Sequence, residues 1–202
     1  TPPERKQEAI QLQCLNMLAA RAVEIGRIDD YLGEFYRKDL KTGRITHDQA
    51  VRLLDNFFTI IETQCGRDTR VIIGGMGREH EKSADEFAML VMDVLEVRRE
   101  HFYPQISLRY YKEMNQDIYD RALRILGSGM TFPMLYNDDV NVPAVMRAMD
   151  VPKKAAEQYS FFGCGEYMLA AQSIGTPHTA LNVATVLELV LHDGINPATG
   201  IL

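Results

Sequence analysis

The stretch Arg70-Val-Ile-Ile-Gly-Gly decides the fold class of this 202-residue chain. Its β-branched apolar run, stopped by two glycines, predicts a strand that is buried on both faces. Helical patterns flank it: Ala50 to Ile61, preceded by Thr46 as a helix cap, and Ser83 to Val97. A buried strand between two helices is typical of an α/β fold with parallel strands.

The same alternation continues in both directions from this strand. Further strands are predicted around Gln105–Arg109, Pro133–Tyr136 and Tyr159–Phe162. Helices are predicted over residues 5–30, Asn115–Leu126, Pro143–Met149, Pro152–Gln158 and Ala180–Leu191. Polar and glycine-rich clusters follow the strands, so the carboxyl ends of the strands are the expected site-bearing edge.

The composition excludes several classes of protein. Hydrophobic residues make up 46% of the chain, which argues against disorder. A net charge of −6 without a basic stripe argues against nucleic-acid binding. No apolar run is long enough for a membrane span, and the polar start lacks the core of a signal peptide. We therefore expect a soluble, cytoplasmic protein with no nucleic-acid or membrane partner.

The stretch Tyr159-Ser-Phe-Phe-Gly-Cys-Gly-Glu-Tyr is the strongest candidate for chemistry. Glycines on both sides give Cys164 backbone freedom that a packing cysteine does not need. In an extended segment Glu166 lies on the same face as Cys164, and aromatic neighbours would exclude water, which raises the pKa of a carboxyl toward that of a general base. The alternative is a tight turn with a buried cysteine and a surface glutamate.

Three further features of the sequence bear on possible chemistry. His178, in a Gly/Pro-containing loop, would allow a Cys164/His178 thiol hydrolase. Glu166 argues against it, because a nearby carboxylate opposes thiolate formation, whereas a reaction of the neutral thiol has no such conflict. The turn Asn137-Asp138-Asp139 follows a strand without further ligand spacing, so we predict no metal site there. The three cysteines are too widely spaced for a disulfide framework or a zinc site.

The segment Phe132–Val145, together with Phe162-Gly-Cys-Gly-Glu, resembles the glycyl radical enzyme family, the group of pyruvate formate-lyase and glycerol dehydratase. Other stretches are similar to the family in the same order: Gly26–Leu32, Tyr36–Leu40, Ile72–Gly75, Gln105–Arg109 and Leu187–Gly194. The resemblance covers essentially the whole chain.

This resemblance implies part of a ten-stranded α/β barrel and radical chemistry on a small-molecule substrate. In the family, a C-terminal glycine stores a radical that an S-adenosylmethionine-dependent activating enzyme installs. The cysteine matching Cys164 becomes a thiyl radical that takes hydrogen from the substrate, and the glutamate matching Glu166 is the general base for elimination. Residues 1–202 are then an internal fragment of the barrel domain, without the C-terminal glycyl radical domain. We expect the fragment to be inactive alone, and the full-length protein to be a homo-oligomer.

Departures from the family pattern bear on the reaction. Residue 163 is Gly where pyruvate formate-lyase has a second cysteine, which disfavours formate acetyltransferase chemistry. Tyr167 replaces a usual proline, and His178 stands where polyol dehydratases often have aspartate, so both are candidate substrate contacts. A dehydratase or related C–X lyase is favoured. A C–C lyase or decarboxylase, a formate acetyltransferase, a non-catalytic or split module and the thiol hydrolase stay open as alternatives.

Overall fold

A computed structural model describes residues 2–20, 24–65, 69–101, 103–162, 165–170, 172 and 182–200. In chain order its elements are α1 (Lys6–Ala20), β1 (Glu24–Arg27), α2 (Ile28–Lys41), α3 (His47–Gln64), β2 (Arg70–Gly74), α4 (Glu81–Val97), β3 (Gln105–Tyr110), α5 (Gln116–Gly127), β4 (Met134–Asn137), α6 (Asp138–Met149), α7 (Lys153–Ala156), β5 (Tyr159–Phe162), β6 (Glu166–Leu169) and α8 (Val183–Leu191).

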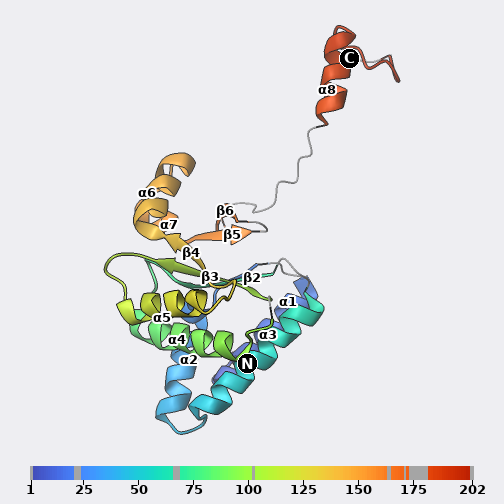
Figure 1. Cartoon of the computed structure of the whole chain (residues 1–202). Helices are drawn as coiled ribbons and strands as arrows, with labels where there is room; N and C mark the ends of the chain where they lie inside the picture. Colours follow the sequence, from blue (N-terminus) through green and yellow to red (C-terminus); the bar gives the residue numbers. More distant parts are fainter. Residues whose placement is uncertain are drawn as a thin grey trace.

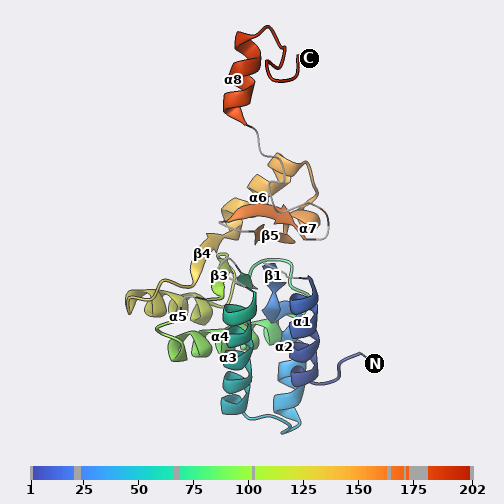
Figure 2. The same ribbon diagram turned by 90° about the vertical axis from the view of Figure 1, so that its right-hand side faces the viewer.

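Four parallel strands form the central sheet in the order β1-β2-β3-β4, so each strand pairs with the next one along the chain. Helices α1 to α5 cover one face of this sheet (Figure 1). The antiparallel hairpin of β5 and β6 lies on the other face with α6 and α7 (Figure 2). The α/β fold with a parallel sheet that the sequence predicts is confirmed.

Side-chain alternation along β2 explains the two layers. Val71 and Ile73 are fully buried in the large core against the helices. Ile72 points the other way and is fully buried in a smaller core that includes Tyr159 and Phe161 of the hairpin. The strand is buried on both faces, as its continuous apolar run predicts.

Helix caps fix two boundaries where the sequence places them. Thr46 and Gln49 form a capping box at the start of α3, with hydrogen bonds of 2.8 and 3.2 Å. Asn115 caps α5 by accepting the backbone N–H of Asp117. Each cap satisfies N–H groups that have no partner within the helix.

The predicted helix over residues 5–30 is wrong at residues 24–27. Helix α1 ends at Ala20, and residues 24–27 form β1, an edge strand that pairs with β2. This strand has only one fully buried apolar residue, Ile25, and Gly26 interrupts it at φ +76°. Four residues with so little apolar pattern carry no strand signal, and pairing with β2 decides their conformation.

The helices around two prolines also differ from the prediction. Helix α6 begins at Asp138, capped by the Asn137 side chain, so Pro143 lies inside the helix rather than in its first turn. Helix α7 is shorter than predicted and has Pro152 as its N-cap. The last helix begins at Val183. Residues 180 and 181, with which the predicted helix begins, lie outside the described residues. Within the described ranges, no helix is long and apolar enough to span a bilayer.

Candidate functional site

The β5–β6 hairpin carries the motif that the sequence singles out. Phe162 pairs with Glu166 in an antiparallel register, so residues 163–165 connect the two strands. Gly165 has φ +113°, a conformation that favours glycine, and a Cβ there would lie 3.3 Å from the Tyr136 hydroxyl. Both the backbone conformation and the close Tyr136 hydroxyl therefore favour glycine at position 165.

The predicted site residues are described unequally. Cys164 and His178 lie outside the described residues, so their geometry relative to Glu166 stays a prediction. Glu166 is exposed at the start of β6. Tyr167 is 38% exposed, and its ring stacks on Tyr159 with centroids 5.4 Å apart.

The expected aromatic surroundings are formed only in part. Tyr159 and Phe161 are buried, and Phe161 stacks on Tyr136 with ring centroids 3.7 Å apart. Glu166, in contrast, is exposed. The described residues therefore build an apolar wall under the hairpin, but they do not enclose the carboxylate of Glu166.

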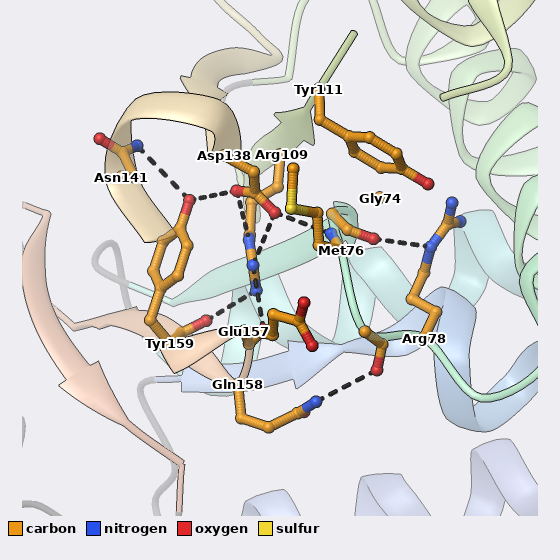
Figure 3. Close-up of polar contacts among 12 residues, drawn as sticks. Gly74, Met76, Arg78, Arg109, Tyr111, Asp138, Asn141, Glu157, Gln158 and Tyr159 are labelled. Carbon is orange, nitrogen blue, oxygen red and sulfur yellow. Dashed lines mark hydrogen bonds and ion pairs between the residues drawn. The ribbon is translucent and has the colours of Figure 1, made fainter. Parts of the chain in front are cut away.

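A buried cluster that the sequence analysis missed joins the hairpin to the sheet (Figure 3). Arg109 of β3 and Asp138 of α6 are both fully buried and form a bidentate ion pair, with N–O distances of 3.0 and 2.7 Å. The Tyr159 hydroxyl donates a hydrogen bond to Asp138 at 2.5 Å. We call these three residues, Arg109, Asp138 and Tyr159, the hairpin clamp.

The clamp is saturated with further contacts. The Arg109 guanidinium lies 3.7 Å from the centroid of the Tyr159 ring and donates to the backbone oxygens of Tyr159 and Glu157. The Met76 N–H donates to the Asp138 carboxylate at 2.8 Å. Burial, offset in part by Arg109, raises the pKa of Tyr159 well above its usual value, which keeps the phenol a donor.

The glycine pair after β2 makes room for this ion pair. A Cβ on Gly75 would lie 2.8 Å from Nε of Arg109 and 3.0 Å from a carboxylate oxygen of Asp138. Gly75 also has φ +91°. The sequence predicted only the end of a strand at this position, and the structure adds a close approach of side chains from β3 and α6.

A second set of contacts ties β1 to β5. Ser160 donates a hydrogen bond to Glu24 at 2.6 Å, and Arg27 donates to the Gln158 side chain at 2.6 Å and to the Met76 carbonyl at 2.7 Å. Burial raises the pKa of Glu24, and the Ser160 bond opposes that shift. These residues border a cavity of about 310 Å³ beside the hairpin.

Asn137, Asp138 and Asp139, predicted as a polar turn, instead end β4 and begin α6 directly, and each has a structural partner. Asn137 caps α6, Asp138 pairs with Arg109, and Asp139 accepts the backbone N–H of Lys112. Among the residues that the structure describes, no three His, Cys, Asp or Glu side chains come together as a metal site. The clamp residues left one signal in the sequence, namely charged residues near the ends of two neighbouring strands.

The fold and the hairpin together define a class, the α/β proteins with an antiparallel hairpin held on one face of a parallel sheet. The family model described as "Pyruvate formate lyase-like" matches residues 1–201. The chain belongs to this family, and the resemblance to glycyl radical enzymes is confirmed.

Relatives of known activity are similar to the whole chain. An isethionate sulfite-lyase of Nitratidesulfovibrio vulgaris is 28% identical, over 96% of this chain and 26% of its own length. A (2S)-3-sulfopropanediol dehydratase of Klebsiella oxytoca is 23% identical, over 89% of this chain and 23% of its own. The chain thus spans about a quarter of the curated relatives it matches.

Solved structures agree on the fold. A glycyl radical enzyme from Archaeoglobus fulgidus is 27% identical with a TM-score of 0.74, over 96% of this chain and 27% of that one. A hydroxyproline dehydratase from Clostridioides difficile is 22% identical with a TM-score of 0.71, over 98% of this chain and 28% of that one. The second likeness supports the fold alone.

Proposed function

We propose that this chain forms part of the barrel of a glycyl radical lyase, with Cys164 as the hydrogen-abstracting residue and Glu166 as the general base. The observation that carries the proposal is the β5–β6 register in a family member: Phe162 opposite Glu166 leaves Gly163-Cys164-Gly165 as the connection. The hairpin clamp supports it, because a fixed hairpin is what a positioned thiol needs.

The glycyl radical, on a glycine outside these residues, supplies the initial removal of hydrogen from the Cys164 thiol. The sequence favours a thiol that reacts in its neutral form, because Glu166 follows Cys164 by two residues and a carboxylate opposes thiolate formation. An S-adenosylmethionine-dependent activating enzyme is the proposed partner that generates the radical.

The chain's own residues then carry an elimination. The Cys164 thiyl radical takes a hydrogen atom from a hydroxyl-bearing carbon, which restores the S–H bond and leaves a carbon radical. Glu166 accepts the hydroxyl proton, the neighbouring C–X bond breaks, and X leaves with its electron pair as hydroxide or another anion. The resulting radical, now beside a carbonyl, recovers hydrogen from Cys164.

The favoured substrates are small hydroxylated molecules with a leaving group on the adjacent carbon. Relatives named as isethionate sulfite-lyase and (2S)-3-sulfopropanediol dehydratase support C–S or C–O cleavage. A relative named as indoleacetate decarboxylase, 23% identical, keeps C–C cleavage as the second candidate. Isethionate, (2S)-3-sulfopropanediol and indoleacetate are therefore the first substrates to compare.

The test uses the protein translated from the whole reading frame, activated without oxygen. We expect a glycine-centred doublet in the electron paramagnetic resonance spectrum and turnover of one compound in the panel. Cys164→Ser should keep the doublet and lose turnover, and Glu166→Gln should reduce turnover at least a hundredfold, the usual contribution of a general base.

Two results would decide against the proposal. Full turnover by Cys164→Ser would remove the assigned role of the thiol, and no doublet under activating conditions would remove radical chemistry. Rapid alkylation of Cys164 at neutral pH would instead favour the thiol hydrolase, because it indicates a thiolate.

A further inference from the structure

A groove of about 560 Å³ lies on the helical side of the molecule, between the start of α1, the end of α2 and α3. The residues that matter for the argument are Arg5, Asp39, Arg44, Ile45, Arg52 and Leu53. We infer that this groove binds a small organic anion that carries a hydroxyl group, with phosphate monoesters as the best-matched class.

Three guanidinium groups give the groove its charge. Arg5, Arg44 and Arg52 all line it, although the chain as a whole has a net charge of −6. Arg5 has an ion-pair partner in Glu8 at 3.6 Å, but both side chains are largely exposed, so this pair is weak. Arginine presents paired N–H donors that match the oxygens of phosphate. Phosphate is therefore the anion that suits the groove best.

The requirement for a hydroxyl comes from Asp39. Its carboxylate is almost fully buried, and one oxygen accepts the Lys6 backbone N–H at 2.8 Å. The other oxygen, Oδ1, forms an ion pair with Arg44 at 3.8 Å, but it is buried and accepts no hydrogen bond among the described residues. A buried acceptor without a donor is costly, and a ligand hydroxyl beside the anionic group would satisfy it.

The ammonium group of Lys6 does not satisfy this oxygen. Lys6 is fully buried, and its Nζ lies 4.6 Å from the centroid of the Tyr36 ring and 3.4 Å from the Ala50 carbonyl. The lysine is therefore committed to the helix core beneath the groove. Its Nζ therefore does not compete for the ligand position.

The remaining wall suits a short carbon chain. Ile45 and Leu53 are half-buried at the groove, between the arginines and the buried carboxylate. The volume lies within the range of about 300–1,000 Å³ for small-molecule sites. The groove shares no residue with the hairpin clamp, and the helices that form it lie on the opposite side of the sheet from the hairpin (Figure 2), so this inference does not depend on the proposed function.

The experiment is calorimetric titration of the full chain with glycerol 3-phosphate, inorganic phosphate and glycerol. We expect glycerol 3-phosphate to bind with a Kd below about 1 mM, inorganic phosphate at least tenfold more weakly, and glycerol not measurably. Arg44→Gln/Arg52→Gln should raise the Kd for glycerol 3-phosphate at least tenfold. Arg99→Gln, an exposed arginine outside the groove, is the matched control and should leave it unchanged.

Three outcomes would overturn the inference: no binding of glycerol 3-phosphate up to about 10 mM, unchanged binding by the double variant, or equal binding of inorganic phosphate. The last result would show that Asp39 recognises no hydroxyl. If circular dichroism shows that the double variant is unfolded, Arg52→Gln alone and a salt titration of the unmodified chain replace it. Affinity that does not fall with added salt would then contradict the arginine site.

Discussion

The two faces of the central sheet are built from different interactions. On the helical face, β2 and β3 present Val71, Ile73, Ile106 and Leu108 to a continuous apolar core. On the hairpin face, the same strands present Arg70 and Arg109, and the apolar cluster around Ile72 is small. Non-directional apolar burial is sufficient to hold helices on a sheet, whereas charged and hydrogen-bonded pairs fix one geometry for the hairpin.

The largest expected effect is the loss of the clamp carboxylate. Asp138→Ala leaves the Arg109 guanidinium buried without its partner, and we expect the free energy of unfolding to fall by about 3–5 kcal/mol. Amide hydrogen exchange should rise most in β5 and β6, because these strands lose their tie to β3. Chemical denaturation with exchange measured by mass spectrometry checks both.

The matched control for this variant removes both charges. Arg109→Met/Asp138→Leu replaces the ion pair with apolar side chains, so it should be more stable than Asp138→Ala alone. If the double variant were instead less stable than Asp138→Ala, by the cost of losing a second buried side chain, Arg109 and Asp138 would not act as a pair.

The second prediction tests the helical face. Leu54 is fully buried in the large core, and Leu54→Ala should lower the free energy of unfolding by about 2–5 kcal/mol through lost burial and a cavity. The loss should appear as a uniform fall in global stability rather than as local exchange in the hairpin. Preferential opening of β5 and β6 in this variant would show that the two faces are not separable.

Tyr159→Phe sharpens the comparison by removing one oxygen atom. The phenol donates to a fully buried carboxylate, and we expect a cost of about 1.5–3 kcal/mol, as for hydrogen bonds to charged groups. The ion pair between Arg109 and Asp138 stays, so exchange should rise in the hairpin less than in Asp138→Ala. Tyr110→Phe, on the helical side of β3, is the control that should cost less.

The smallest effect concerns pH. Burial lowers the pKa of Lys6 to about 7, while its unfolded value is about 10.4. Between these values the unfolded chain binds more protons, so stability should rise from pH 7 to 8, by at most about 1.4 kcal/mol. Urea denaturation at both pH values tests this, and Lys6→Met should remove the rise. A rise that persists in Lys6→Met would assign it to another group.

The sequence correctly predicted the elements that neighbouring residues specify. The apolar run of β2 and the capping box of Thr46 and Gln49 were confirmed because neighbouring residues suffice to specify them. Strand β1 was missed because a partner strand, rather than its own sequence, defines it. The clamp was missed for the same reason, since Arg109 and Asp138 are 29 residues apart and only the sheet brings them together.

The sequence motif located the candidate site, but the sequence did not predict how the residues around it are arranged. The aromatic residues of Tyr159-Ser-Phe-Phe stood out in the sequence, and two of them form the expected buried wall. The exposure of Glu166 was one of two alternatives that the sequence left open, because it depends on which face of the hairpin meets the sheet. That choice is made by the clamp and by the Glu24–Ser160 bond, both of which join distant parts of the chain.

The register of Phe162 opposite Glu166 has a consequence for insertions and deletions. Because side chains alternate along a strand, adding or removing one residue between these two positions either extends the connection or shifts β6 by one place. A shift caused by removing one residue would turn Tyr167 away from Tyr159 and bring Met168 to its place. The length of this short segment therefore carries as much structural information as its composition, and point substitutions alone would not expose that constraint.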